Sequence, residues 1–265
     1  MKKNNILPLI LGCLLVLSSC LSDKDLPAKE KEGELSTDIT KSIVDHSKWD
    51  GLLKKYVDKK GYVDYSGFQK DSLNLNKYID YLAKTPPQEN WSIEEQLAYY
   101  INLYNAGTVQ LIIRHDMPGS IRDIEDNGTG PWQSEFLTIG DKKISLGAVE
   151  KAILMPMKEP RIHFAINCAS ESCPKLLREA YTAENVEELM ERATKEFLNG
   201  PRNDIKKDTA RISSIFQFYP ADFKVRHPSV KAYINQYTEA ELDENTVLMY
   251  IKYDWSLNNQ KNPPN

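Results

Sequence analysis

The sequence predicts an α+β fold: a single, mainly helical domain with a small antiparallel or mixed sheet. Segments with apolar residues at helical spacing outnumber segments with the alternating pattern of a strand. The few candidate strands lie far apart along the chain, so the sheet that they form is small. The stretch from residue 41 onward, about 220 residues, has the length of one domain or of two small ones at most.

The first 20 residues have the pattern of an export signal. Lys2 and Lys3 precede an apolar stretch from Ile6 to Leu17, and about 12 apolar residues are too few to cross a hydrocarbon core that needs roughly 20. The segment 17–20, Leu-Ser-Ser-Cys, resembles the bacterial lipobox, which implies that Cys20 is diacylated and becomes the mature N-terminus. The alternative is an ordinary secretory signal with a chance cysteine. We therefore expect a lipoprotein held at the membrane by its lipid on Cys20, in the cell envelope.

The chain that follows residue 20 is acidic overall and begins with a polar segment. Residues 1–20 contain two of the 34 basic residues and none of the 38 acidic ones, so the remaining chain has a net charge of −6. No basic block stands out, which argues against nucleic acid as a partner. Residues 21–40 are charged and poor in aromatic residues, which predicts a flexible tether. Because residue 21 is leucine and not the aspartate of the inner-membrane retention signal, the outer membrane is favoured.

Helical patterns dominate the first half of the domain. The clearest helix runs from Ile93 to about His115, because Ser92 and Glu95 form a capping box at its start. Pro86 ends the helix before it. The predicted helices cover residues 41–58, 67–83, 93–115 and 145–154, with a short strand or turn at 61–65.

Strands and helices mix in the second half. Ile162, Phe164 and Ile166 recur with period two, which predicts a strand over Arg161–Asn167. A turn begins at Pro174, which also suits the first turn of a short helix through 175–178. The remaining elements are a helix at 183–198, a strand at 211–216, a helix at 228–237 and a strand at 247–253, within a globular domain at 41–258 that is followed by a disordered tail at 259–265.

Cysteine and histidine gather in one segment. Once Cys13 leaves with the signal and Cys20 carries lipid, Cys168 and Cys173 remain, close to His163. His163 is the candidate base for a Cys168 thiolate. On one continuous strand the two would lie roughly 16 Å apart on opposite faces, so a dyad requires the chain to curl back after residue 167.

Purely structural interpretations of these residues stay open. Cys173 precedes Pro174, so it is expected to cap the short helix. Cys168 is equally well a buried structural thiol, and His163 a hydrogen-bonded structural histidine. In an oxidising envelope the two cysteines could also pair across a tight loop, as a local or redox-active bridge.

Further polar residues are candidates for a site. Asn102 and Asn105 share one face of the long helix. Asparagine is a poor helix former, so we expect both amides to make specific hydrogen bonds there. They would hydrogen-bond a neighbouring loop or a ligand, and Tyr104 would line the core or a cleft. Asp254 follows a predicted strand and could orient a histidine or cap a turn. No metal-ligand spacing and no glycine-rich phosphate loop appears, so we expect no metal and no cofactor.

Several motifs in order resemble one known family. They are residues 100–106 (YINLYNA), residues 160–165 (PRIHFA), Cys168 with Ser172 and Pro174, and residues 253–255 (YDW). Together they resemble the domain of unknown function family 547 (DUF547), over about residues 97–258. The resemblance places His163 and Cys168 on the family's motif positions, and implies that serine and cysteine interchange before the proline. It brings no established activity.

A looser similarity concerns shape. A long helix, a histidine-bearing segment and a late aspartate are similar to transglutaminase-like and papain-like domains. Those enzymes have their cysteine at the start of the long helix, whereas residues 96–105 contain none. The leading hypothesis is an envelope-surface domain with a cleft lined by His163, Cys168, Asn102, Asn105 and Asp254. If the domain is an enzyme, the expected class is acyl transfer or amide hydrolysis, with Cys168 as nucleophile, His163 as base and Asp254 as orienter. The alternatives are a non-catalytic module that binds a peptide or glycan in the same cleft, and a redox role for the two cysteines.

Overall fold

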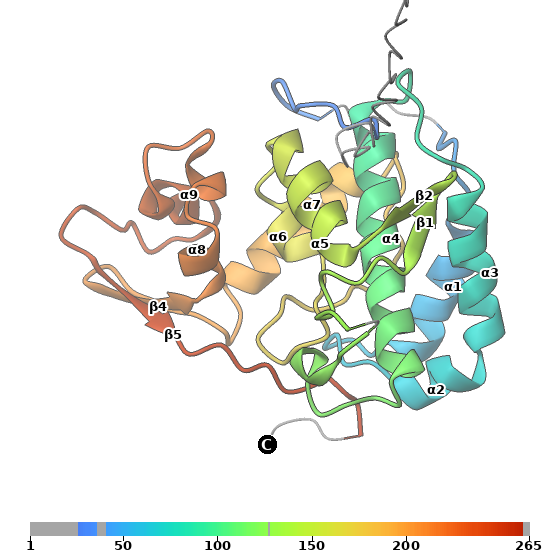
Figure 1. Ribbon diagram of the computed structural model, residues 1–265. Coiled ribbons are helices and arrows are strands. Elements are labelled where there is room, and N and C mark those ends of the chain that lie inside the picture. The colour runs from blue at the N-terminus through green and yellow to red at the C-terminus, as the bar shows by residue number, and fades with distance from the viewer. Residues whose placement is uncertain (1–25, 36–40, 127, 262–265) are drawn as a thin grey trace, which may run out of the picture.

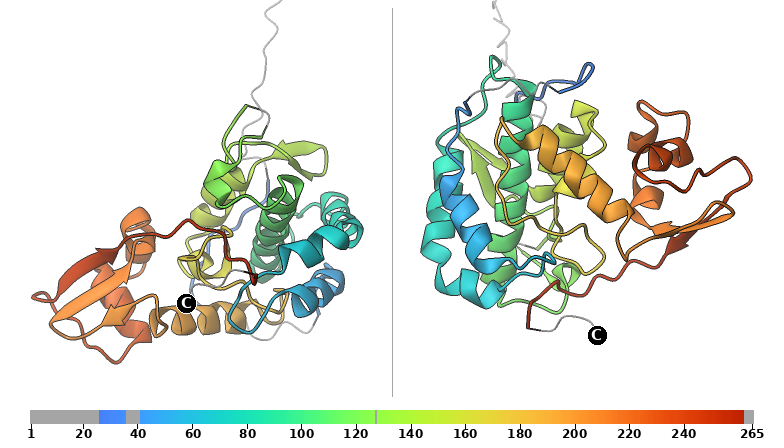
Figure 2. Two further views of the ribbon diagram at one scale, coloured as in Figure 1. Left: turned by 90° about the horizontal axis from the view of Figure 1, so that it is seen from below. Right: turned by 180° about the vertical axis from the view of Figure 1, so that it is seen from behind.

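A single long helix, α4 (Ile93–Arg114), forms the centre of the molecule. The computed structural model describes residues 26–35, 41–126 and 128–261, so the predicted signal with Cys20 lies outside the described residues. Figure 1 shows α4 between two groups of helices, and Figure 2 shows the same arrangement from below and from behind. Because α4 is buried on nearly all sides, its apolar residues surround the helix rather than forming one stripe.

The predicted start of α4 is confirmed, with one difference. The Ser92 hydroxyl accepts a hydrogen bond from Glu95 N at 3.1 Å. The Glu95 carboxylate accepts hydrogen bonds from the backbone N–H groups of Ile43 and Val44, at 3.0 and 2.9 Å. One half of the capping box therefore serves to fasten an earlier segment onto the long helix.

Three helices pack along one side of α4. The aromatic residues between them form the core there, with Trp49 stacked on Tyr78 at 5.9 Å between ring centroids. The predicted helix at 67–83 is interrupted near Asp71, whose backbone starts a second helix. The three are α1 (Ser47–Tyr56), α2 (Tyr65–Lys70) and α3 (Ser72–Ala83).

A β-hairpin and a series of short helical turns follow α4. In the hairpin, Leu137 pairs with Ile144 in an antiparallel register. The predicted helix at 145–154 is present, but its second part is π-helical. These elements are η2 (Ile121–Asp123), β1 (Leu137–Ile139), β2 (Lys142–Ile144), α5 (Leu146–Ala148), the π-helix η3 (Val149–Leu154) and η4 (Met155–Met157).

The predicted strand over residues 161–167 is wrong. Ile162–Ala165 form a short helix, α6. All four of its residues are buried, so the apolar alternation reflects packing on every side and not the two faces of a strand. The short helix predicted at 175–178 is also absent from the structure, because residues 174–177 have no regular secondary structure. The next helix is α7 (Val186–Leu198), within the predicted range.

The C-terminal elements form a lobe beside the helical body (Figures 1 and 2). Its sheet is mixed: β3 (Asp204–Ile205) runs antiparallel to β4 (Thr209–Ser213), and β4 runs parallel to β5 (Val247–Ile251). Three helical segments complete the lobe: α8 (Ile215–Phe218), η5 (Asp222–Lys224) and α9 (Val230–Tyr237). The predicted class, a mainly helical α+β domain with a small mixed sheet, is confirmed.

Two segments predicted to be loose are packed against the domain. In residues 26–35, Lys31 forms an ion pair of 2.5 Å with the buried carboxylate of Glu159, and Pro27 O accepts a hydrogen bond of 2.7 Å from the Tyr100 hydroxyl. A buried carboxylate needs cationic partners, which is why this charged stretch is held in place. Gln260, in the predicted tail, donates to the backbone carbonyls of Tyr56 and Tyr62.

Candidate functional site

Asn102 and Asn105 of α4 each bind the backbone of a neighbouring segment through one donated and one accepted hydrogen bond. Asn102 Nδ2 donates to Tyr181 O at 2.6 Å, and Tyr181 N donates to Asn102 Oδ1 at 3.1 Å. Asn105 Nδ2 donates to Ala165 O at 3.0 Å, and Asn167 N donates to Asn105 Oδ1 at 2.8 Å. All four backbone groups would otherwise be buried without partners. The predicted contact is therefore with neighbouring loops, and Asn105 fixes both ends of the stretch that leads to Cys168.

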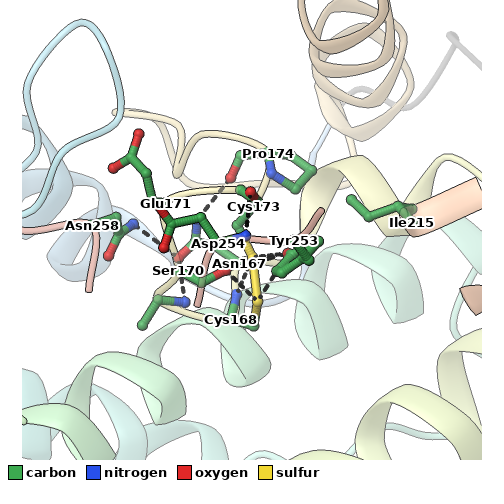
Figure 3. Close-up of a disulfide and its surroundings, with 12 residues drawn as sticks. Asn167, Cys168, Ser170, Glu171, Cys173, Pro174, Ile215, Tyr253, Asp254 and Asn258 are labelled. Atoms are coloured by element: carbon green, nitrogen blue, oxygen red, sulfur yellow. Dashed lines mark hydrogen bonds between the residues drawn. A yellow bond between two sulfur atoms is a disulfide. The ribbon is translucent and has the colours of Figure 1, made fainter. Parts of the chain in front are cut away.

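After Asn167 the chain curls back and brings the two cysteines together. Cys168 and Cys173 form a disulfide with a Cα–Cα distance of 6.3 Å. Asn167 supports the loop from inside: its side chain accepts from Ala169 N at 2.9 Å and donates to Pro174 O at 2.7 Å (Figure 3). Cys173 therefore closes a bridge and does not cap a helix, because residues 174–177 directly after it have no regular secondary structure.

The bridge has one sheltered and one accessible sulfur. Cys173 is 3% exposed, whereas Cys168 is partly exposed. The Tyr253 hydroxyl lies 3.2 Å from Cys173 Sγ and 3.5 Å from Cys168 Sγ, and Ser170 Oγ lies 3.3 Å from Cys168 Sγ (Figure 3). Burial raises the pKa of Tyr253 to about 12, so this hydroxyl keeps its proton at neutral pH. Of the two cysteines, Cys168 is therefore the more exposed.

Cys168, His163 and Tyr104 open onto one pocket of about 220 Å³. Its walls are mainly aromatic, and its polar groups come from distant parts of the chain. The lining residues are Tyr104, Trp132, Glu150, Lys151, His163, Ile166, Cys168, Cys173, Pro174, Ile215, Phe218, Tyr219, Tyr253 and Trp255.

His163 is held by an aspartate that the sequence did not indicate. Its Nε2 lies 2.7 Å from Asp222 Oδ2, and its ring stacks on Tyr219 with 4.1 Å between centroids. Asp254, the residue predicted for this role, accepts hydrogen bonds of 2.9 and 2.6 Å from the backbone N–H and the hydroxyl of Ser256, which lower its pKa. In the structure it is Asp222 that orients His163.

Glu150 is the second group that sequence reasoning missed. Its carboxylate is buried, and it accepts hydrogen bonds from the hydroxyls of Tyr219 at 2.5 Å and Tyr104 at 3.3 Å. Trp132 Nε1 donates in turn to the Tyr104 hydroxyl at 3.3 Å. Burial, and then the charge of Glu150, raise the pKa of Tyr219, so this hydroxyl remains a donor.

Two signals point to Glu150. It lies in a π-helix, a rare conformation that is frequent at functional sites. In the sequence, it stands on the apolar face of the predicted helix at 145–154, together with Leu146, Val149 and Ile153. An acid at such a position requires partners, and this signal was available before the structure.

Residues 88–198 match the family model described as a protein of unknown function, DUF547. The DUF547 span contains Asn105, Glu150, His163 and both cysteines, and it supports the resemblance that the motifs indicated. Asp222 and the residues 253–255 lie beyond it. No curated protein and no solved structure matches the chain, so the likeness in shape to transglutaminase-like and papain-like domains stays a prediction.

A second, larger cleft borders the pocket at Cys168 and His163. It has a volume of about 900 Å³, and it shares Pro174 and Tyr253 with the first pocket. Lys59, Lys60 and Asp254 stand among its polar residues. Within residues 26–35, 41–126 and 128–261, no three His, Cys, Asp or Glu side chains are grouped to hold a metal ion. The helices of this described part include none that is both long and apolar enough to span a bilayer.

Proposed function

We propose that this protein is a thiol-dependent enzyme of acyl transfer or amide hydrolysis, with Cys168 as its nucleophile. The observation that carries the proposal is that Cys168 and an aspartate-held His163 open onto the same aromatic pocket. A thiol beside an oriented imidazole is the arrangement that nucleophilic catalysis requires. Asp222 takes the orienting role predicted for Asp254.

The proposed reaction first requires reduction of the Cys168–Cys173 disulfide. A dithiol reductant supplies two electrons and two protons, which convert the disulfide into the Cys168 and Cys173 thiols and leave the reductant as a disulfide. With Nε2 of His163 on Asp222, Nδ1 is the ring nitrogen that takes the Cys168 proton. The thiolate then attacks the acyl carbonyl, and the leaving amine or alcohol takes that proton from His163. Water or a second amine cleaves the resulting thioester and restores the thiol.

The proposed setting is the bacterial cell envelope, with the chain anchored through lipid on Cys20 and the outer membrane favoured over the inner. Support comes from the export-signal pattern of residues 1–20 and from Leu21 after the cysteine. The Cys168–Cys173 bridge also fits an oxidising compartment, where disulfides persist.

A second candidate function is non-catalytic binding of a peptide or glycan. The observation that favours it is the cleft of about 900 Å³, which exceeds the pocket at Cys168 in volume and shares Pro174 and Tyr253 with it. In that case Cys168→Ser would leave ligand affinity unchanged, since the thiol would take no part.

The test uses p-nitrophenyl acetate as a generic acyl donor. The Cys173→Ser variant leaves Cys168 free without any reductant, and we expect one acetyl group on Cys168 by intact mass and peptide mapping. Cys168→Ser, with Cys173 free, is the matched control and should take up no acetyl group there. His163→Ala in the Cys173→Ser background should slow acetylation at pH 7 by about 100-fold or more. Acetylation as fast without His163 as with it would refute the proposed mechanism.

A further inference from the structure

The pocket of about 220 Å³ that Cys168 and His163 line contains a buried carboxylate whose described partners are neutral. Glu150 is 4% exposed, and the hydrogen bonds that its carboxylate receives come from two tyrosine hydroxyls. A buried carboxylate without a cationic partner is costly, and a cation that enters the pocket would relieve that cost. Lys151 also lines the pocket, but its side chain is exposed, so water screens its charge.

The Glu150 carboxylate has capacity left for such a cation. An ionised carboxylate offers about four lone-pair sites. Tyr219 occupies a site on Oε1 and Tyr104 a site on Oε2. One site on each oxygen therefore remains for the N–H donors of an ammonium group, which carries three.

Aromatic rings surround the same space. Trp132 and Trp255 meet edge to face at 5.7 Å, and Tyr253 lies 4.5 Å from Trp255, measured between centroids. Aromatic faces attract organic cations, and they do so more strongly where water is displaced. Trp255 already accepts one cation on its surface, because the Arg122 guanidinium carbon lies 5.4 Å from the ring centroid.

We infer that this pocket binds an alkylammonium group, such as the side-chain ammonium of a lysine, with the charge on Glu150 and the alkyl chain among the aromatic rings. As a substrate class this rests on the proposed function, in which the amine is the acyl acceptor. The ammonium gives one proton to Glu150, and the neutral amine attacks the thioester carbonyl. Collapse of the intermediate forms the amide and breaks the C–S bond, and the second amine proton passes through His163 to the Cys168 thiolate.

Calorimetric titration of the oxidised protein tests the binding step alone, since Cys168 cannot react while it is bridged. The probes are N-acetyl-lysine amide and N-acetyl-norleucine amide, whose shorter alkyl side chain lacks the terminal ammonium group. We expect the lysine probe to bind at least tenfold more tightly. Glu150→Gln should remove this preference, whereas Glu135→Gln, the same charge change at an exposed position, should preserve it.

Each outcome decides a different point. Equal affinity for the two probes, or no binding of the lysine probe, would overturn the inference even if Cys168 forms an acetyl adduct. Selective binding without any adduct would keep the ammonium site and refute the proposed reaction. If Glu150→Gln fails to fold, Trp132→Leu replaces it, with an expected loss of affinity of several-fold for the lysine probe.

Discussion

Replacing Asn105 by alanine should destabilise the protein strongly, although the asparagine lines neither of the two pockets described above. The side chain is 2% exposed, and it pairs with Ala165 O and Asn167 N. The variant leaves both backbone groups buried without partners, at about 1–3 kcal/mol each. Alanine is the better helix former, which returns about 0.5 kcal/mol. The expected net loss in the free energy of unfolding is about 2–5 kcal/mol.

Urea denaturation at constant m-value measures this loss. Gln110→Ala, on the same helix, is the matched control: Gln110 donates to Asn76 Oδ1 at 2.7 Å in an exposed pair. We expect its effect to stay within about 0.5 kcal/mol. A loss below about 1 kcal/mol for Asn105→Ala, or one equal to that of Gln110→Ala, would refute the view that this amide satisfies buried backbone groups.

Three further predictions concern stability. Burial lowers the pKa of His46 to about 4, below its usual 6.5, so the contribution of this histidine to stability should be complete above pH 6.5 and fall as the pH drops toward 4. His46→Gln should make the midpoint of urea denaturation depend less on pH over that range. An unchanged pH dependence of the midpoint would count against this reasoning. Burial alone would raise the pKa of Glu159, but its basic partners lower it to about 2, so its contribution to stability should persist above pH 4.5 and disappear toward pH 2. At pH 7, Glu159→Gln should lower the free energy of unfolding by about 3–5 kcal/mol. A loss under about 1 kcal/mol would contradict this prediction. Gly61→Ala should lower the melting temperature markedly, because Gly61 has φ +89° and an added Cβ would lie 2.2 Å from Lys175 Cβ, whereas Gly51→Ala, with open space around it, should leave that temperature unchanged or raise it.

Local signals predicted the helices well. The Ser92 cap predicted the start of α4 correctly, because helix starts depend on neighbouring residues, and the end predicted at about His115 lies within one residue of the observed end at Arg114. The stretch around Ile162 shows where this reasoning fails. Its apolar alternation fits a strand, yet the segment is buried between α7 and the C-terminal lobe, so tertiary packing overrides the pattern.

The candidate site was predictable only in part. His163 and Cys168 stand out by residue type and by their nearness in the sequence. Asp222 begins η5, 59 residues away from His163, and no local pattern links the two. Glu150 could have been recognised as an acid on an apolar helix face, whereas its tyrosine partner at position 219 depends on how the C-terminal lobe packs.

The packed N-terminal segment limits how far the domain can stand from a bilayer. If Cys20 carries lipid, as proposed, residues 21–25 are the whole spacer before the segment that contacts α4. Five residues reach at most about 18 Å even when fully extended. The domain would then rest close to the headgroups, with the end that carries residues 26–35 toward the lipid and the end that carries α2 farthest from it (Figure 1). Such a stand-off would restrict the protein to substrates within a thin layer above the membrane.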